Sequence, residues 1–308
     1  MEDLSGKELG RYRIVAPCGE GGMAAVYKAF QPGTERYVAL KILPRHFARE
    51  ATFQERFQQE AQIIANFQHP HILPVFDYGE EDDYAYLAMP FIEGGTLAEL
   101  INGGMVDYQR VRRIISQVGD ALDYAHSYDV VHRDIKPTNI LIDERQNALL
   151  TDFGISKIVG DLVNITATGQ VIGTPAYMSP EQIKGEALDG RSDIYSLGIV
   201  LYEMVTGRTP YRADTPPALF VKHLLDPLPL PSALKPDIPP VVENVILKSL
   251  AKDRDDRYQT AADMVKAVQQ AIDPAQTSWA PAAIPAAPAR PNNEIVVDKT
   301  TVEFDETA

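Results

Sequence analysis

Apolar positions alternate with polar ones in the first third of the chain and recur at helical spacing in much of the rest. From Arg11 to about Met89, short β-prone runs are separated by Gly, Pro and acidic turns. This pattern predicts strands near 12–18, 23–30, 36–43, 72–78 and 84–89. The segment from Glu50 to Phe67 repeats its apolar residues at helical spacing, and we expect it to be the single helix of this half.

Beyond Gly94 and Gly95 the pattern becomes mainly helical. Amphipathic stretches predict helices near 107–127, 191–206, 239–250 and 260–272. The predicted fold class is therefore α+β, with a small β-rich lobe before a larger helical lobe and a cleft between them. Residues 274–308 are rich in Pro and Ala and then polar, so they are predicted to form a disordered tail that lacks the apolar content to offset its ordering entropy.

Composition narrows the class of protein. A chain of 308 residues with 45% hydrophobic and 23% charged residues is typical of a soluble globular protein and is long enough for two lobes. The net charge of −14 disfavours nucleic acid as a partner and would favour basic peptides. The single cysteine, Cys18, excludes an internal disulfide and points to a reducing cytoplasm.

Neither a secretory signal nor a membrane span is predicted. The opening residues 1–6 carry no cationic stretch followed by an apolar core. The nearest apolar run, 194–205, is interrupted by Ser196, Gly198 and Glu203, so it is expected to be a helix buried inside a domain.

Two short motifs carry candidate chemistry. The loop from Val131 to Asn139 places a carboxylate, an ammonium group and an amide close together, as Asp134, Lys136 and Asn139. Shortly after it, Asp152 begins an Asp-Phe-Gly turn that follows an apolar run. An Asp-Phe-Gly turn alone has little weight, and its position after Asn139 makes it specific.

In this chain order, the motifs resemble those of the bacterial branch of eukaryotic-like (Hanks-type) Ser/Thr protein kinases. The resemblance runs from about Leu9 to about Ile272. It implies a bilobal protein-kinase-like fold, with a kinase domain over 9–273 that divides into an N-lobe (9–92) and a C-lobe (93–273). It also implies ATP as cofactor, with Mg²⁺, or alternatively Mn²⁺, as the metal ion.

The resemblance assigns a role to each residue of the two motifs. Asp134 would accept the proton of the substrate hydroxyl, and Lys136 would steady the transferring phosphate. Asn139 and Asp152 would bind the metal ions. Lys136 at its position further implies Ser and Thr rather than Tyr as acceptors.

A cation and a carboxylate are predicted to meet in the first lobe. Lys41 lies in an otherwise apolar strand, where a solvated edge lysine is the ordinary alternative. Glu60 falls in the middle of a helical stripe of apolar residues formed by Phe53, Phe57, Ile64 and Phe67. A carboxylate there is costly unless a cation meets it, and the resemblance makes Glu60 the partner of a phosphate-binding Lys41. Glu55 projects to the opposite face and should be solvated.

The nucleotide site implied by the resemblance draws on a Gly-rich hairpin, a strand and a hinge. Its expected residues, besides Lys41, are Cys18, Gly19, Glu20, Gly21, Gly22, Met23, Ala24, Val26, Ala39, Met89, Pro90, Ile92 and Leu141. Ala24 replaces the third glycine of the family's pattern, and the hairpin alone could be an ordinary Gly-rich turn. Val26, Ala39 and Leu141 could equally be plain core. Cys18 falls where the family roofs the adenine, although a small buried hydrophobe is favoured there.

An activation loop is implied between Asp152 and the Ser179-Pro180-Glu181 motif. Thr166 and Thr168 occupy the usual autophosphorylation positions, and Arg133 would pair with a phosphate on that loop. A flexible surface loop with incidental threonines is the alternative. Thr174 would line the substrate pocket. Three further residues match the family's scaffold: Glu181 and Arg257 as a buried ion pair, and Asp193 as a holder of the catalytic-loop backbone.

The predicted function is a protein Ser/Thr kinase that acts on protein substrates and is activated by autophosphorylation. A pseudokinase scaffold and a small-molecule phosphotransferase of the same fold are the alternatives. Intact Lys41, Glu60, Asp134, Asn139 and Asp152 count against the first, and the protein-substrate motifs count against the second. We also expect a transient homodimer through the N-lobe. The expected location is the cytoplasm, either as a free protein or as the cytoplasmic part of a membrane-anchored receptor kinase.

Overall fold

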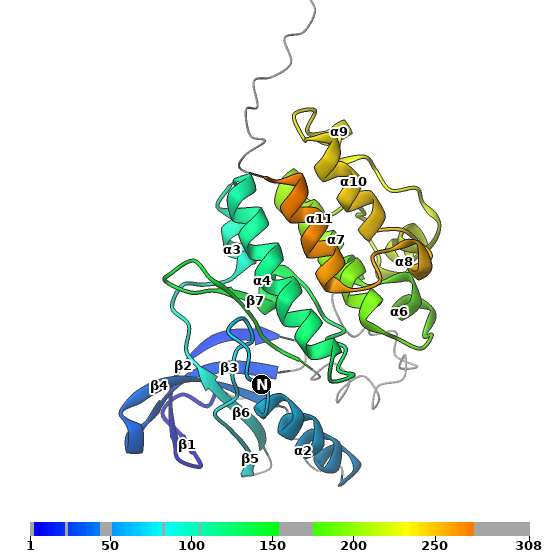
Figure 1. The fold of residues 1–308 in the computed structure, drawn as a ribbon. Helices are drawn as coiled ribbons and strands as arrows, with labels where there is room; N and C mark the ends of the chain where they lie inside the picture. Colours follow the sequence, from blue (N-terminus) through cyan, green and yellow to red (C-terminus); the bar gives the residue numbers. More distant parts are fainter. Residues whose placement is uncertain are drawn as a thin grey trace, which may run out of the picture.

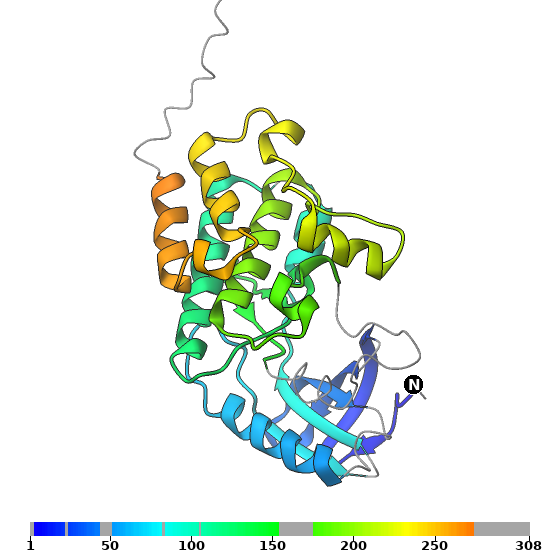
Figure 2. The same ribbon diagram turned by 90° about the vertical axis from the view of Figure 1, so that its right-hand side faces the viewer.

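The computed structural model describes residues 3–21, 24–43, 51–81, 84–104, 106–153 and 175–273. A sheet and one helix form the first part, and a larger helical part follows; Figures 1 and 2 show the two parts in perpendicular views. We call them the N-lobe and the C-lobe. The predicted α+β class and its order along the chain are confirmed.

Six antiparallel strands form the N-lobe sheet in the order β1-β2-β3-β4-β6-β5. Their bounds are β1 (Glu8–Leu9), β2 (Tyr12–Gly21), β3 (Ala24–Gln31), β4 (Arg36–Leu43), β5 (Asp77–Glu81) and β6 (Tyr84–Pro90). Apolar side chains such as Tyr27, Val38 and Leu40 are buried together on the sheet. In the central pair, Lys41 of β4 lies directly opposite Val26 of β3, so both side chains face the same side of the sheet.

The helix α2 (Ala51–Ala65) packs beside this sheet (Figure 1). Phe57, Ala61 and Ile64 of α2 are buried, and burial of a Phe or Ile side chain contributes about 1.5–3 kcal/mol. Glu55 on the opposite face is exposed, as predicted. The predicted apolar stripe is thus confirmed where the structure describes the side chains.

The C-lobe is built around α4, α7 and α11, which pack against one another. Its helices are α3 (Leu97–Asn102), α4 (Tyr108–His126), α6 (Pro180–Lys184), α7 (Gly190–Thr206), α8 (Pro216–Leu225), α9 (Pro231–Leu234), α10 (Pro240–Ser249) and α11 (Ala261–Ala271). Every residue from Ser192 to Tyr202 is buried, so α7 is a central helix surrounded by protein. The four predicted helices correspond to α4, α7, α10 and α11.

The prediction of a strand over 72–78 is wrong in its position, because β5 begins only at Asp77. Pro74 cannot donate a ladder hydrogen bond, and the residues before it are attached to the C-lobe instead. There, the Leu73 amide donates to the Leu150 carbonyl at 2.9 Å, and the Leu150 amide donates to the His71 carbonyl at 2.8 Å. Leu150 belongs to a small hairpin of β7 (Ile140–Ile142) and β8 (Ala148–Leu150), which was not predicted.

The short helices α3, α6, α8 and α9 were also not predicted. The helices α3, α6 and α9 have four to six residues, which is too short for helical periodicity to stand out. The ten-residue α8 begins with Pro216 and Pro217, a pair that also indicates a turn. Their starts nevertheless carry local signals: Thr96 caps α3 and Ser179 caps α6, each in a capping box.

Cys18 is exposed, so the favoured interpretation of a small buried hydrophobe is wrong. The register between β2 and β3 shifts twice, between Ile14 and Ala16 and between Pro17 and Gly19. Each irregularity resets the alternation of the strand. The alternation that turns the side chains of Tyr12 and Ile14 toward the core therefore does not continue to Cys18.

Among the described residues, we find no helix with the length and apolar content needed to cross a membrane.

Candidate active site

The loop that follows α4 is shaped by one buried carboxylate. Asp193 of α7 accepts hydrogen bonds from the backbone amides of His132 and Arg133, each at 2.8 Å, and its Oδ2 also lies 2.8 Å from His126 Nε2. Arg133 has φ of +72°, a left-handed conformation that L-residues rarely adopt without support. Burial would raise the pKa of Asp193, but hydrogen bonds from His126 and the loop outweigh it and lower the pKa. The prediction that Asp193 holds this backbone is confirmed.

Asp134, Lys136 and Asn139 meet at the end of this loop. Asp134 Oδ2 lies 2.7 Å from Lys136 Nζ and accepts a hydrogen bond from Asn139 Nδ2 at 3.0 Å. Asn139 Nδ2 also donates to the Asp134 carbonyl at 2.8 Å. The 3₁₀ turn η2 (Pro137–Asn139) brings Asn139 back toward Asp134. A carboxylate, an ammonium group and an amide thus form one connected cluster.

Asp152, which follows the strand β8, forms an ion pair with Lys41 of the N-lobe. The Lys41 ammonium lies 2.8 Å from Asp152 Oδ2. Burial alone would raise the pKa of Asp152, but the charge and hydrogen bond of Lys41 dominate and lower it. Asp152 has φ of +72°, and the amide of Thr151 donates to the Asn139 carbonyl at 3.0 Å, so the two motifs are joined. Lys41 is therefore not a solvated edge lysine.

Glu60 is half-buried on α2. Its predicted contact with Lys41 stays a prediction. The structure places the Lys41 ammonium in an ion pair with Asp152.

Three rings link the loop that carries Asp134 to the N-lobe, and two of them had no role in the sequence-based predictions. The rings of His132 and Phe153 lie 4.6 Å apart, and Phe153 meets Phe67, which follows α2, edge to face at 5.6 Å. His132 Nε2 lies 2.8 Å from the Thr151 carbonyl. Only Phe67 had a signal of its own, as part of the apolar stripe. The sequence signal for the packing of His132 and Phe153 is indirect: both are rings placed next to charged residues of the two motifs, where a buried ring needs a packing partner.

The expected nucleotide residues gather on the inner side of the sheet and hinge. Ala24 and Met89 are buried in one apolar cluster, against which Ala39, Ile92 and Leu141 pack. Val26 and Pro90 are half-buried, Gly19 is exposed, and the backbones of Glu20 and Gly21 pair with β3. Gly22 and Met23 lie outside the described residues. Thr151 Oγ1 lies 3.7 Å from Met89 Sδ, which places the end of β6 next to the Asp152 turn.

Residues 175–182 form a platform beside the loop that carries Asp134. Gln182 of α6 donates to the Arg133 carbonyl at 2.7 Å. Tyr177, in the 3₁₀ turn η3 (Pro175–Tyr177), donates to Glu203 Oε2 at 2.6 Å, and Ser196 donates to the Tyr177 carbonyl at 2.8 Å. Thr166, Thr168 and Thr174, for which the sequence predicts roles in this region, lie outside the described residues.

The predicted buried ion pair between Glu181 and Arg257 is confirmed. Arg257 binds Glu181 through two hydrogen bonds of 2.7 and 2.8 Å, and Ser192 donates to the same carboxylate at 2.7 Å. Burial opposes ionisation, but Arg257 and Ser192 lower the pKa of Glu181 to about 2. This fork fixes α6 to the loop before α11.

The half-buried Lys252 supports the helix α8 behind the platform. Lys252 Nζ donates to the His223 carbonyl at 2.6 Å and to Tyr211 OH at 2.9 Å. The imidazole of His223 is fully buried, and its Nδ1 lies 3.0 Å from Tyr195 OH. Burial lowers the pKa of Lys252 to about 8 and that of His223 to about 4.

Lys252 should make the unfolding free energy rise with pH. Its folded-state pKa is about 8 and its ordinary value 10.5, so the unfolded chain binds more protons above about pH 8. The rise should appear between about pH 8 and pH 9.5, below the range in which tyrosines ionise. Urea unfolding of the parent and of Lys252→Met measures it, with the exposed Lys248→Met as control. An equal slope in the parent and Lys252→Met would contradict the assignment.

The sequence from residue 12 to residue 269 matches the family model described as "Protein kinase domain". The chain belongs to the protein kinase family. Membership implies ATP and a divalent metal ion as general requirements of this kinase domain. The match covers both lobes and every motif described above.

Bacterial relatives are similar over most of the chain. The serine/threonine-protein kinase PrkC of Bacillus subtilis is 43% identical over 272 residues, which are 88% of this chain and 42% of PrkC. The serine/threonine-protein kinase PknH of Mycobacterium tuberculosis is 40% identical over 273 residues, 88% of this chain and 44% of PknH. The kinase domain thus spans less than half the length of these relatives.

Solved structures agree with the fold. A crystal structure of the Mycobacterium tuberculosis PknI kinase domain has a TM-score of 0.70 and 30% sequence identity, and it covers 87% of this chain and 98% of that one. A cysteine-to-alanine mutant of the same domain has the same TM-score with 29% identity, and it covers 88% of this chain and 99% of that one. The bilobal protein kinase fold is therefore shown.

Proposed function

We propose that this chain is a serine/threonine protein kinase that transfers the γ-phosphate of ATP to Ser and Thr hydroxyls of proteins. One observation carries the proposal: the Asp134, Lys136 and Asn139 cluster is joined by backbone to the Lys41 and Asp152 ion pair. Phosphoryl transfer requires mainly positioning and charge stabilisation, and these residues supply both. PrkC and PknH are both serine/threonine-protein kinases, and this supports neither the scaffold interpretation nor the small-molecule phosphotransferase interpretation.

Asp134 is the proposed base. Its carboxylate already accepts from an ammonium and an amide, which hold it in one orientation for a substrate hydroxyl. Lys136 would stabilise the negative charge of the transferring phosphate while it stays beside Asp134. Both groups stand on a loop whose backbone Asp193 fixes, so their positions are set before substrate binds.

The residues present fit a nucleotide with a divalent metal ion. Carboxylate and amide oxygens are the ligands that Mg²⁺ and Mn²⁺ prefer. Asn139 turns its Nδ2 toward Asp134, which leaves Oδ1 to face a metal ion, and Asp152 offers its carboxylate. Lys41 would bind the α and β phosphates, with Glu60 as its support, and Mg²⁺ would offset the phosphate charge. The adenine would lie against Ala39, Met89 and Leu141, under Val26 and Cys18, with the Pro90 carbonyl and the Ile92 amide as its hinge contacts.

Activation would follow from phosphate on Thr166 or Thr168. Arg133 supports this proposal because its Nε is buried and has no hydrogen-bond partner within the described part of the chain. A phosphate would give that guanidinium a charge-assisted partner. The same proposal includes basic protein substrates, a transient homodimer through the N-lobe and a cytoplasmic location. It also includes a kinase domain over 9–273, so that 274–308 would lie outside the domain.

Phosphate mapping tests the proposal. The full chain is incubated with ATP and Mg²⁺ beside an Asp152→Asn variant, and phosphorylated residues are identified by mass spectrometry. We expect phosphate on Thr166 or Thr168 in the parent only, because the variant loses a metal-binding carboxylate. An unphosphorylated parent that still binds ATP, as measured by calorimetry, would bring the scaffold interpretation forward.

A further inference from the structure

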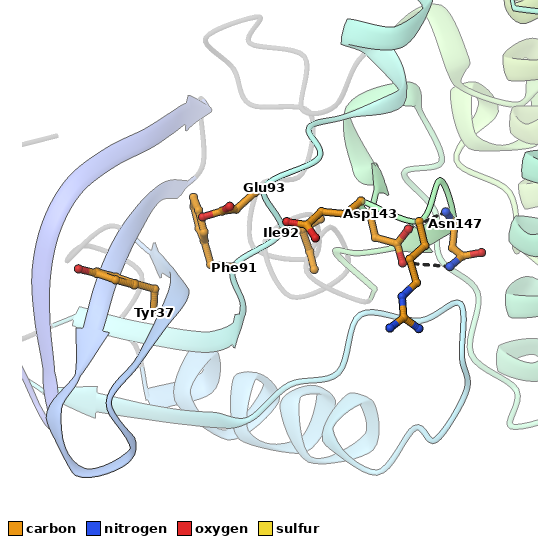
Figure 3. Close-up of a pocket in the computed structure, with 8 residues that line it drawn as sticks. Tyr37, Phe91, Ile92, Glu93, Asp143 and Asn147 are labelled. Atoms are coloured by element: carbon orange, nitrogen blue, oxygen red, sulfur yellow. Dashed lines mark hydrogen bonds between the residues drawn. The ribbon is translucent and has the colours of Figure 1, made fainter.

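A second pocket lies on the outer side of the hinge, with walls from both lobes. Its volume is about 440 Å³, and it is lined by Tyr37, Phe91, Ile92, Glu93, Asp143, Glu144, Arg145 and Asn147. Figure 3 shows Tyr37 and Phe91 on the sheet side, Asp143 and Asn147 on the opposite side, and Ile92 and Glu93 between them. None of the residues proposed for proton transfer or metal binding lines it, and only Ile92 is shared with the proposed nucleotide site.

The C-lobe wall of this outer pocket is rigid. The turn between β7 and β8 is closed by Asp143, which accepts from the Asn147 amide at 2.7 Å and from Asn147 Nδ2 at 3.0 Å. Gln117 of α4 binds the same turn from below, donating to Asn147 Oδ1 at 3.1 Å and accepting from the Ala148 amide at 2.8 Å. A wall fixed in this way loses little entropy when a ligand binds.

The hinge is also held against that wall. The Ile142 amide donates to the Gly95 carbonyl at 2.9 Å. A Cβ added at Gly94 would lie 2.0 Å from the Ile142 carbonyl oxygen, so only glycine allows this close backbone approach. The outer pocket is therefore formed before any ligand arrives.

Aromatic faces in the pocket already accept a cation. Lys28 Nζ lies 4.5 Å from the ring centre of Tyr37 and 4.4 Å from that of Phe91. The same ammonium lies 3.9 Å from Glu93 Oε1, and the Glu93 side chain remains 65% exposed. Tyr37 is 51% exposed, so ring surface remains available to a ligand.

The charge of the lining favours a basic ligand. The lining has three carboxylates, from Glu93, Asp143 and Glu144, and one guanidinium, from Arg145. With the adjacent Lys28 ammonium counted as well, the pocket keeps an excess of one negative charge. Burial opposes ionisation of Asp143, but hydrogen bonds from Asn147 lower its pKa and keep it charged. The net charge of −14 adds long-range attraction for basic partners.

We propose that this outer pocket binds a basic, partly apolar segment of a protein substrate, remote from its phosphoacceptor residue. Arginine or lysine side chains would meet Glu93 and Glu144, and an apolar neighbour would pack on Tyr37 and Phe91. The chain's own residues 274–308 are unsuited, because they carry five acidic residues but only Arg290 and Lys299 as cations. Engagement here would raise the effective concentration of the acceptor at Asp134. The inference rests on the proposed kinase function.

Binding to an inactive chain tests the proposal separately from activity. The probe is a short fluorescent peptide of arginine and leucine without hydroxyl residues, and fluorescence anisotropy is measured on the full chain carrying Asp134→Asn. Adding Glu93→Gln and Glu144→Gln should weaken binding about tenfold. The control adds Glu8→Gln and Glu55→Gln, which remove equal charge at exposed sites away from the pocket, and should change affinity by less than about twofold. Equal weakening by both pairs, or no binding by the parent, overturns the proposal.

Activity then shows whether the pocket serves catalysis. In the otherwise unmutated chain, Glu93→Gln with Glu144→Gln should raise KM about tenfold for an acceptor peptide joined to the arginine and leucine segment. KM for the same acceptor without that segment, and KM for ATP, should stay unchanged. If KM rises for both acceptors, these carboxylates attract substrates in general, and the proposal of a separate binding site is refuted. Inactivity of every variant and of the parent would refute the kinase function while the binding result stands.

Discussion

Asp134→Asn should lower kcat for a peptide acceptor by about 10²–10⁴-fold, the usual contribution of a positioned general base. The asparagine keeps the size of the side chain but cannot take the hydroxyl proton. KM for ATP should stay close to that of the parent, because the nucleotide contacts belong to other residues. Steady-state kinetics with saturating acceptor separates the two constants.

The same loop region offers a matched control for this substitution. Asp129 is exposed and has φ of +59°, a conformation that asparagine also adopts readily. Asp129→Asn should leave both constants unchanged. A parent-like kcat in Asp134→Asn would show that the hydroxyl proton leaves by another route.

Glu181→Gln should destabilise the protein by about 3–5 kcal/mol, because it leaves the fully buried guanidinium of Arg257 without its counter-charge. Replacing Glu181 and Arg257 together by methionine should recover part of this loss, since no charge is then buried alone. Urea unfolding at neutral pH measures both changes. A loss below about 1 kcal/mol for Glu181→Gln would contradict the buried-pair assignment, since that value is typical of exposed pairs.

The stability that Glu181 contributes also depends on acid. Its pKa is about 2 in the folded protein against an ordinary 4.5, so the unfolded chain takes up the proton first as pH falls. The contribution is complete above pH 4.5 and is lost as pH approaches 2. Glu181→Gln should lack this part of the acid sensitivity, whereas the exposed Glu55→Gln should keep it.

The sequence predicted the long elements because their apolar periods are strong. The helices α4, α7, α10 and α11 were found within about two residues of their ends, and β4 was found over its full length. The strand over 72–78 was misplaced because Ile72 and Leu73 are apolar for a different reason: they join the two lobes. Local patterns cannot tell a strand from an extended connection between two cores.

Candidate site residues could be predicted, but several of their contacts could not. Resemblance to kinases supplied Asp134, Lys136, Asn139 and Asp152, and the structure brings them together with Lys41. The roles of those residues stay predictions. The exposure of Cys18 was not predicted, because the residue types in β2 do not reveal the two register shifts that change which face its side chains take. The outer pocket was missed because its walls are far apart in the chain, and its charges there look like ordinary surface residues.

Two backbone connections between the lobes restrict how the protein can move. One is the covalent hinge where the N-lobe ends, near Ile92, and the other is the pair of hydrogen bonds that Leu150 makes with His71 and Leu73. Two fixed points define a line, and rotation about that line preserves both connections, whereas sliding of one lobe along the other breaks the hydrogen bonds. Rotation of one lobe against the other therefore has a single low-energy axis. Because Thr151, the neighbour of Leu150, lies 3.7 Å from Met89, the end of β6 lies close to that axis and should move least when the lobes rotate.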